Sequence, residues 1–598
     1  MESGLAYASR AAIWKLRTAA YKQKIKIQDQ LGLYSYMDWI EDNEASFNEL
    51  SKQTVDAHNF AYQPQFSLLI SGGKKVTSDI INTLESLFEQ TYRNWEVCLV
   101  TPSGKKITIN DTISAFIQAD ERIRYQLQEQ HKQVDPIIQA LRMARGEFVV
   151  MLNAGAILSP NSLFEVIKFL DLSPQIDIVY TDEDHLTDNG LSRKDPFFKP
   201  DWSPELMLST NYLMHSFIRR SLLKEISAGY SSEDLSNYGD LIYRCIEQTQ
   251  RIHHIPLVLY HREPDEIAHP EQRRVALNLQ CKWVEAHLER SGIQNAKASV
   301  SEHGKVQVTW PVENQKVSII IPTKDHVDYL RKCITSIQAL TKYDNYEIVL
   351  IDSGSREKET NRYYAEIQHS SDIHIVSYAQ DFNFSAALNL GAQNAQGEIL
   401  IFLNNDTEVI ESGWLDELIR WVARQEVGIV GAKLLYQDGV IQHAGIVVGM
   451  EGHGSHVFSR VREGYSGPFG SVDWYRNYSA VTAACIAMRR EVFNKIGGFD
   501  ENYELVFSDI DICLRVIRAG YRVVYTPFAR LIHHEGMTRF RHIPTHDIKL
   551  GYAHFEDTIR HGDPFYNPNL SYSVRIPTLR RPNEIIPLVR LQEIVKYV

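Results

Sequence analysis

The sequence lacks three features that would mark it as a membrane, secreted or nucleic-acid-binding protein. It has no run of about 18 apolar residues, so it predicts no membrane-spanning helix. Its first residues contain no apolar segment followed by a small-residue cleavage site, which predicts that there is no signal peptide. The net charge of -12 lacks the basic surplus that phosphate binding needs, so we expect no nucleic-acid partner.

Cysteine is also scarce, with six residues among 598. No two cysteines have the close spacing of a zinc site or a redox pair, so we expect buried apolar residues in a reducing compartment. With no targeting segment in the sequence, this pattern predicts a cytoplasmic protein. The six residues are Cys98, Cys245, Cys281, Cys333, Cys485 and Cys513.

The chain is too long for one hydrophobic core. Strand-like and helix-like patterns alternate from Phe66 and restart in the same order at Val317. This alternation predicts two tandem α/β domains, each with a mostly parallel, Rossmann-like sheet. The predicted divisions are an N-terminal helical segment over 1–60, a first α/β domain over 61–300, a second over 316–561, and an extended tail over 562–598 that wraps the surface.

Two pairs of strings recur in order along the chain. QTYRNWEVCLV parallels TKYDNYEIVLI, and ARGEFVVMLNAG parallels AQGEILIFLNND. Ordered recurrence of this kind indicates a distant internal duplication.

The segment 9–28 carries several lysines and arginines and no acidic residue. Apolar residues are interleaved with these charges. One interpretation is a basic amphipathic helix that contacts an anionic membrane surface. The other is a solvated helix that packs its short apolar side on the next domain.

Polar residues follow three apolar strands of the second half. They are Pro322-Thr323-Lys324, Asp352-Ser353-Gly354-Ser355 and Asn404-Asn405-Asp406. Because ligands bind beyond the carboxyl ends of parallel strands, we expect these residues to converge on one crevice. A carboxylate such as Asp406 suits a hard divalent cation there, although it would also suit a turn cap.

Two further groups follow later strands. A helix is predicted to begin near Asp509, where a carboxylate serves either as a cap stabilised by the helix dipole or as a base facing an acceptor hydroxyl. Asp511 lies two residues on, so at most one of the pair should face the crevice. His533 and His534 follow the last apolar strand, where a histidine either binds metal or diphosphate or is an ordinary core or surface residue.

Four ordered strings of the second half resemble glycosyltransferase family 2, whose members have the GT-A fold and invert the anomeric centre. They are VSIIIPTKD, FNFSAALNLGAQNAQGEILIFLNNDTEV, VTAACIAMRREVFNKIGGFDE and FSDIDICLRVIRAGYRVVYTPFARLIHHE. The resemblance covers nearly all of 317–539 and is strongest to bacterial surface-polysaccharide enzymes, including rhamnosyltransferase-like ones.

This resemblance implies a role for each matching residue. Asp509 would be the catalytic base, although Ser508 precedes it where the family usually has Glu or Asn. The DXD metal motif falls on Asn404-Asn405-Asp406; its first acid is replaced by Asn404, which leaves Asp406 as the main ligand for Mg²⁺ or Mn²⁺. His534 matches a histidine after the last strand and is the second predicted metal ligand. The residues predicted to bind the nucleotide-sugar are Pro322, Thr323, Asp352, Asn404 and Asn405, and among them Asp352 would recognise the nucleobase. The residues predicted on the acceptor side are Trp474, Gly498, Phe499 and Asp511.

The first half resembles the same family but lacks its chemistry. Ser71-Gly72-Gly73 and Pro102-Ser103 replace the nucleotide-binding residues, and Asn153-Ala154-Gly155-Ala156 replaces the metal motif. Tyr238 takes the place of the base. Asp182, Glu183 and Asp184 form an acidic cluster that a solvated loop would explain. We therefore expect a degenerate, inactive domain that serves packing, acceptor binding or assembly.

Three hypotheses follow. The first is an inverting glycosyltransferase that moves a sugar from a nucleotide-sugar donor to a glycan or lipid-linked acceptor in bacterial surface-polysaccharide synthesis, in the cytoplasm or at the inner face of the membrane. The second is a noncatalytic carbohydrate-binding scaffold, which the changes at Asn404 and Ser508 would suit. The third is a nucleotidyltransferase, but IPTKDHVDYL lacks the glycine-rich basic loop that holds a triphosphate.

Overall fold

The computed structural model describes residues 34–71, 76–101, 111–127, 136–187, 190, 192–228, 238–263, 270–534 and 544–596. The basic segment 9–28 lies outside these residues, as do Gly72, Gly73, Pro102 and Ser103. No helix within the described ranges combines the length and the apolar character needed to cross a membrane.

The chain folds into two compact units. The first contains the described parts of Met1–Trp202 and Asn211–Ala276, together with Leu579–Pro582. The second contains Ser203–Thr210, the described parts of Leu277–Thr578 and of Asn583–Val598. The main division therefore falls inside the helix α11 (Pro270–Arg290), and the hairpin that follows this helix belongs to the second unit.

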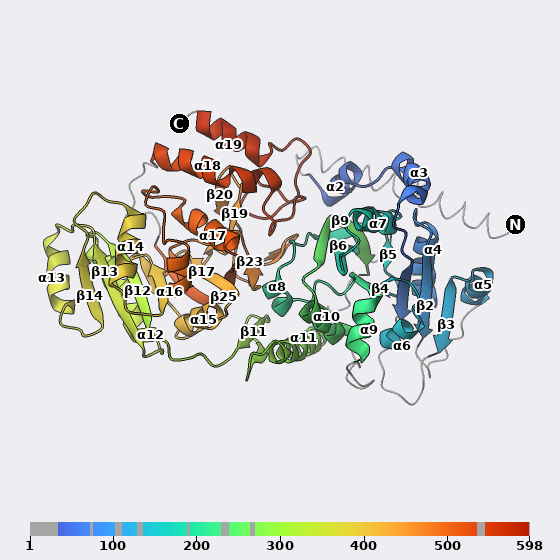
Figure 1. Cartoon of the computed structure of the whole chain (residues 1–598), viewed down its shortest axis with the longest axis horizontal. Coiled ribbons are helices and arrows are strands. Elements are labelled where there is room, and N and C mark those ends of the chain that lie inside the picture. The colour runs from blue at the N-terminus through green and yellow to red at the C-terminus, as the bar shows by residue number, and fades with distance from the viewer. Residues whose placement is uncertain are drawn as a thin grey trace. The chain divides into compact units, whose positions relative to one another are not determined.

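The first unit is built on a mixed sheet with the strand order β3-β2-β1-β4-β8-β6-β9-β5, and β7 pairs with β6 (Figure 1). Strands β1 to β4 are parallel, β8 is antiparallel to both of its neighbours, and β6 is parallel to β9. The strands are β1 (Phe66–Ser71), β2 (Trp95–Thr101), β3 (Ile123–Leu127), β4 (Phe148–Asn153), β5 (Ile157–Leu158), β6 (Ile178–Leu186), β7 (Arg193–Phe197), β8 (Phe217–Arg219) and β9 (Ile252–Arg262).

The second unit repeats this plan. Its large sheet has the order β14-β13-β12-β15-β24-β17-β25-β16. In addition, β18 pairs with β17 and β23 pairs with β25. The strands are β10 (Lys297–Val300), β11 (Val306–Thr309), β12 (Val317–Thr323), β13 (Tyr346–Asp352), β14 (Ile373–Ser377), β15 (Ile399–Leu403), β16 (Thr407–Val409), β17 (Val427–Leu435), β18 (Ile441–His443), β19 (Ile446–Val448), β20 (Gly454–His456), β21 (Ser466–Gly467), β22 (Gly470–Ser471), β23 (Arg476–Asn477), β24 (Cys485–Arg489) and β25 (Arg522–His533).

The predicted internal duplication is confirmed by the strand orders, which match position by position along the two sheets. A set of three residues joined by hydrogen bonds recurs as well. In the first unit the Ser67 hydroxyl donates to Glu96 at 2.7 Å and accepts from the Gly146 N–H at 2.8 Å. In the second unit Ser318, Glu347 and Gly397 repeat these contacts at 2.6 and 2.7 Å. Both glycines lie so close to the serine backbone that a Cβ would collide with it.

Helices cover the sheets and complete the elements that alternate with the strands (Figure 1). Those of the first unit are α2 (Tyr36–Asn43), α3 (Phe47–Asp56), η1 (Ala57–Asn59), α4 (Val76–Phe88), α5 (Asp111–Ala119), α6 (Pro136–Met143), α7 (Ser162–Leu172), α9 (Arg220–Ala228) and α10 (Tyr238–Gln248). Those of the second unit, apart from α11, are α8 (Pro204–Ser209), α12 (Val327–Leu340), α13 (Lys358–Ile367), α14 (Phe384–Asn394), α15 (Trp414–Val422), α16 (Arg490–Lys495), α17 (Ser508–Arg518), α18 (Thr545–His561) and α19 (Pro587–Lys596).

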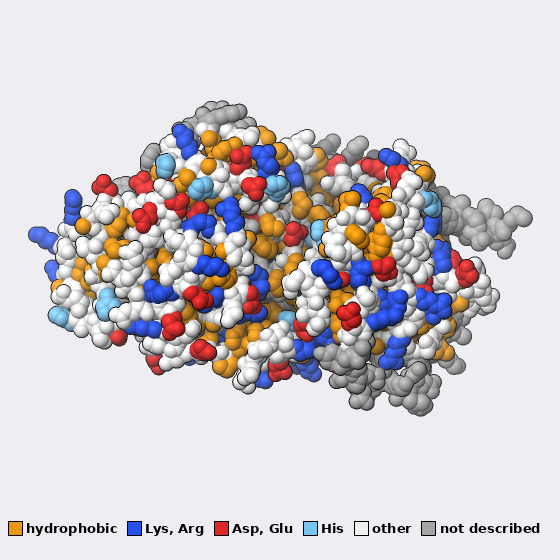
Figure 2. Space-filling view, viewed as in Figure 1, with side chains coloured by type: hydrophobic (Ala, Val, Ile, Leu, Met, Phe, Trp, Pro, Cys, Tyr) orange, Lys and Arg blue, Asp and Glu red, His pale blue; other side chains and the backbone are white. Residues whose placement is uncertain are grey.

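The C-terminal tail packs on the second unit, beside α18. Asp563 accepts hydrogen bonds from the Val448 N–H at 2.8 Å and the Ser479 hydroxyl at 2.7 Å. Tyr566 and Leu570 are buried. Other apolar side chains of the tail, among them Ile585, Ile586 and Val589, remain exposed, and Figure 2 shows hydrophobic side chains among charged ones over α19.

All six cysteines are buried and free, as the sequence predicted. Burial raises the pKa of each thiol, to about 12 for Cys98 and Cys333 and to about 11 for Cys281. Such thiols are not activated nucleophiles, so we assign the cysteines a packing role.

Candidate active site

The predicted convergence of three strand ends is present in the second unit. Strands β12 and β13 are parallel, with Thr323 paired to Asp352 at their carboxyl ends. The Asn405 side chain, just beyond β15, donates to the Thr323 hydroxyl at 3.2 Å. Pro322 and Thr323 are themselves buried.

Asp352 is held in one orientation by its neighbours. Its Oδ1 accepts the Ser355 N–H at 3.0 Å and the Tyr364 hydroxyl at 3.2 Å. Its Oδ2 makes no hydrogen bond with any residue that the structure describes. The carboxylate is half-buried, and so it has one oxygen directed to the protein and one that a ligand can use.

Asp406 lies beside a histidine from the last strand of the sheet. Strands β16 and β25 are antiparallel, and their register pairs Thr407 with His533. This register brings His533 Nε2 to 3.1 Å from Asp406 Oδ1, and both side chains are buried. The Asn404 side-chain amide lies 3.3 Å from the same ring nitrogen.

Gln442 sets the tautomer of His533. The Gln442 amide nitrogen donates to the His533 carbonyl at 3.3 Å, so its oxygen is the atom that faces His533 Nδ1 at 2.6 Å. Nδ1 therefore carries the proton, and in the neutral ring Nε2 carries the lone pair. A ligand histidine that donates its other ring N–H to a carbonyl oxygen is the usual arrangement at metal sites.

His534, the histidine that the sequence analysis assigned to the metal, donates its backbone N–H to the Asp406 carbonyl at 2.9 Å, but its ring has other partners. Its Nδ1 accepts a hydrogen bond from the Gln437 amide, and its Nε2 lies 3.2 Å from Glu408 Oε2. Both ring nitrogens are thus occupied by side chains other than Asp406. The adjacent His533 is the residue that sequence reasoning passed over, because only the strand register distinguishes the two.

The first turn of α17 carries Asp509 and Asp511 in different environments. Phe507, with φ of 68°, precedes the helix and Ser508 begins it. Asp509 is half-buried, and its Oδ1 accepts the Ile510 N–H at 3.0 Å. Asp511 is buried, and its Oδ2 accepts from Arg515 Nε at 2.7 Å.

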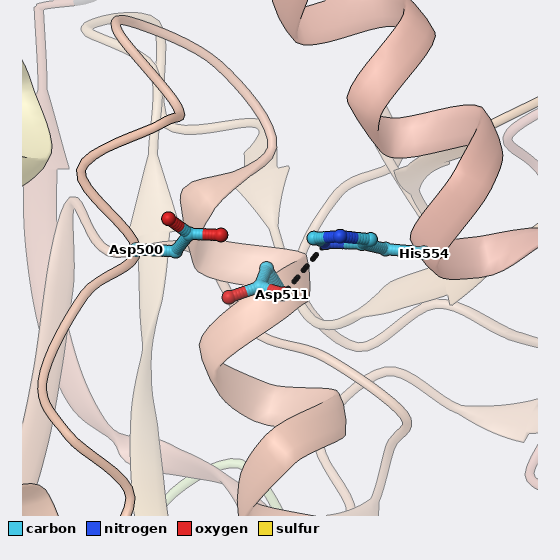
Figure 3. A group of neighbouring side chains, drawn as sticks. All are labelled: Asp500, Asp511 and His554. Atoms are coloured by element: carbon cyan, nitrogen blue, oxygen red, sulfur yellow. Dashed lines mark ion pairs between the residues drawn. The ribbon is translucent and has the colours of Figure 1, made fainter.

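Asp511 belongs to a small group with Asp500 and His554, whose ligand atoms all lie within 4.8 Å of one another (Figure 3). His554 comes from α18 and its Nδ1 lies 3.3 Å from Asp511 Oδ1. Because Arg515 already neutralises the charge of Asp511, we interpret this group as a packing contact between α17 and α18.

The other residues predicted on the acceptor side have packing contacts. Phe499 is buried against Phe402 and Phe493. Gly498 has φ of 72°, and its carbonyl accepts from Arg515 at 2.7 Å.

Trp474 lies against Gly470 and 5.5 Å from the Arg476 guanidinium. Arg476 pairs with Tyr525 near the beginning of β25, whereas His533 is the last residue of that strand. The structure therefore does not bring Trp474 to the strand ends where Asp352 and Asp406 lie.

The first unit fills the corresponding positions with residues that cannot do the same chemistry. Gly155 takes the place of Asp406, and a Cβ there would collide with the Glu263 side chain. Tyr238, at the position of Asp509, is a buried core residue. The neighbouring pair Asp240–Arg244 is retained at 2.7 Å, as in Asp511–Arg515. The pair shared by both units is therefore structural, and of the two acids in the first turn of α17, Asp509 is the one without a counterpart in the first unit.

The prediction of a solvated loop for Asp182, Glu183 and Asp184 was wrong. The three residues lie on the central strand β6 and are buried. Asp182 Oδ1 lies 2.8 Å from His254 Nε2, and Asp184 Oδ1 lies 2.7 Å from His261 Nδ1. Burial raises the pKa of Glu183, but the Lys199 and Arg262 charges outweigh it and hold the pKa well below its usual range. Buried carboxylates need such partners, so this cluster is an internal ion-pair network.

Comparison with known protein families supports the arrangement of both units. The family model described as "Glycosyl transferase family 2" matches residues 76–227 and 318–497, together more than half of the chain. The chain belongs to glycosyl transferase family 2. Apart from Ser203–Thr210, the first matched region belongs to the first unit, and the second region belongs to the second unit, which agrees with the duplicated GT-A plan.

Two relatives and one solved structure illustrate the likeness. "O-antigen biosynthesis protein RfbC" of Myxococcus xanthus is 38% identical over 512 residues, 84% of this chain and 40% of that protein. "N-acetylglucosaminyl-diphospho-decaprenol L-rhamnosyltransferase" of Mycobacterium tuberculosis is 35% identical over 66 residues, 11% of this chain and 22% of that protein. The crystal structure of GalNAc-T7 with UDP, GalNAc and Mn²⁺ superposes with a TM-score of 0.33 at 18% identity, covering 38% of this chain and 45% of that one. The chain thus spans well under two thirds of the length of these proteins.

Proposed function

We propose that the second unit is an inverting glycosyltransferase that moves a sugar from a nucleotide-sugar to a hydroxyl of a glycan or lipid-linked acceptor in bacterial surface-polysaccharide synthesis. The observation that carries the proposal is the pairing of Asp406 with His533 at the carboxyl edge of the sheet. A carboxylate oxygen and an imidazole lone pair, 3.1 Å apart, are a donor set for a divalent cation.

The residues present fit Mg²⁺ or Mn²⁺, with Asp406 and His533 as the protein ligands. The imidazole favours Mn²⁺ of the two, because Mg²⁺ prefers oxygen ligands. Gln442 would orient His533 from outside the coordination shell. When bound, the cation would neutralise the negative charge that develops on the departing diphosphate.

Asp509 is the proposed base. It would accept the proton of the acceptor hydroxyl as that oxygen attacks the anomeric carbon, and the nucleoside diphosphate would leave from the opposite face. The N-terminus of α17 favours the ionised carboxylate that this role requires. Asp511, bound to Arg515, would hold the helix in place without touching the substrate.

Asp352 is the proposed reader of the nucleobase. A carboxylate only accepts hydrogen bonds, so its Oδ2 favours a base with a ring N–H, as in uracil, thymine and guanine. Cytosine has a lone pair at the corresponding ring nitrogen and would be disfavoured.

The first unit lacks the residues proposed to bind the metal and to act as the catalytic base. We propose that this unit is noncatalytic and serves packing, acceptor binding or assembly.

Thermal stabilisation of the full chain by nucleoside diphosphates tests this assignment. With Mn²⁺ present, the best of UDP, dTDP and GDP is expected to raise the melting temperature more than CDP does, because binding to the folded state stabilises it. A hydrogen bond to a charged group contributes about 1.5–3 kcal/mol, so the affinities should differ by roughly 10- to 100-fold.

The matched control is Asp352→Asn, whose amide both donates and accepts, and which should lose the preference against CDP. Equal stabilisation by all four nucleotides would contradict the assignment of Asp352. No stabilisation by any of them would favour a noncatalytic scaffold instead.

A further inference from the structure

Two residues hold the carboxylate of Asp352, the proposed reader of the nucleobase, in place. The Tyr364 hydroxyl donates to Asp352 Oδ1 at 3.2 Å, and the Ser355 N–H donates to the same oxygen at 3.0 Å. Tyr364 comes from the helix α13, and Asp352 is the last residue of β13.

The chemistry of the groups gives the contact between Tyr364 and Asp352 a direction. An ionised carboxylate only accepts hydrogen bonds, so the Tyr364 hydroxyl is the donor. A second hydroxyl, that of Ser355, lies 3.3 Å from the Tyr364 oxygen and itself accepts the Asp325 N–H at 2.8 Å. Every group therefore supports donation from Tyr364 to Asp352.

The surroundings of Tyr364 keep its hydroxyl in the neutral, donating form. Burial raises the pKa of this phenol, and the negative charge of Asp352 raises it further. A donor from the fixed backbone of Ser355 and a donor from Tyr364 together occupy Asp352 Oδ1. Rotation of the carboxylate would break both contacts, so Oδ2 stays at the position where it would accept a hydrogen bond from the nucleobase.

We propose that Tyr364 is a positioning residue that fixes Asp352 for recognition of the nucleobase. This inference rests on the proposed function of the second unit. It makes the selectivity among nucleobases depend on a residue that does not contact the nucleotide. Without the Tyr364 hydroxyl, Asp352 keeps its charge but loses one of the two contacts that define its orientation.

The test compares Tyr364→Phe with Tyr363→Phe. Tyr363 is the neighbouring tyrosine of α13; its ring packs 4.3 Å from the Arg331 guanidinium, so its substitution controls for changes in helix packing. Calorimetric titration of the full chain with UDP, dTDP, GDP and CDP, each with Mn²⁺, gives the dissociation constants. Melting curves without nucleotide report whether each variant is folded.

We expect Tyr364→Phe to weaken binding of the preferred nucleotide by roughly tenfold, because a carboxylate of Asp352 that is no longer fixed loses its own hydrogen bond to the nucleobase. The affinity for CDP should fall much less, so the preference of the protein for the better nucleotide over CDP becomes smaller. Tyr363→Phe should leave the preference unchanged.

An unchanged preference in Tyr364→Phe, or an equal loss in Tyr363→Phe, would overturn this inference while the proposed function stands. Failure of the wild-type protein to bind any of the four nucleotides would overturn the proposed function and the inference with it. The two failures are therefore distinguishable within one set of titrations.

Discussion

Asp509→Asn is expected to lower the rate of sugar transfer by about 100- to 10,000-fold, the usual contribution of a general base. The amide keeps an oxygen that can accept the Ile510 N–H, now at 3.0 Å from Asp509 Oδ1, so the first turn of α17 should persist. It cannot take a proton from the acceptor hydroxyl. Binding of the nucleotide with Mn²⁺ should stay near that of the wild type, since Asp352, Asp406 and His533 are intact.

Asp511→Asn is the matched control, because it removes the same charge from the same helical turn. Asp511 is buried and bonded to Arg515 at 2.7 Å, so this substitution should lower the melting temperature rather than the turnover of folded enzyme. Single-turnover transfer rates and nucleotide affinities of both variants make the comparison. A transfer rate near that of the wild type in Asp509→Asn would remove Asp509 from the role of base.

His533→Ala is expected to weaken binding of Mn²⁺ by at least about 10- to 100-fold, the loss that removal of even an outer-shell partner causes. The variant loses the imidazole lone pair that lies 3.1 Å from Asp406 Oδ1. Transfer at low Mn²⁺ should fall accordingly and recover in part as Mn²⁺ is raised. The measurement is the dependence of the transfer rate, or of nucleotide-induced stabilisation, on Mn²⁺ concentration.

His534→Ala is the adjacent control. Its ring is bonded to Gln437 and Glu408, so its removal should alter local packing without shifting the Mn²⁺ dependence. A large shift in His534→Ala together with none in His533→Ala would restore the assignment made from the sequence. The pair of variants thus decides between two residues that are neighbours in the chain.

The strand ends of the second unit could be predicted from the sequence because each follows an apolar run. Thr323, Asp352 and Asp406 were identified in this way, and the parallel register of β12 and β13 places the first two side by side. The choice between His533 and His534 could not be made, since a shift of one residue along a strand exchanges its faces. That choice depends on the pairing of β25 with β16, which no local pattern records.

Tyr364 illustrates a second limit of the sequence. It lies on α13, in a segment without a recognisable motif, and its relevance comes only from contacts with Asp352 and Ser355. The acidic cluster on β6 illustrates a third. Its charges suggest solvent exposure, but their partners Lys199, His254 and His261 are distant in the sequence and approach only in the folded sheet.

We propose that catalysis belongs to the second unit alone, which makes the release of nucleoside diphosphate depend on Asp406. This dependence is measured with the full chain and with its Asp406→Ala variant, over a panel of nucleotide-sugars with Mn²⁺. We expect metal-dependent release by the wild type with at least one donor and none above background by the variant. Robust release by Asp406→Ala would show that catalysis does not depend on this site and would contradict the claim.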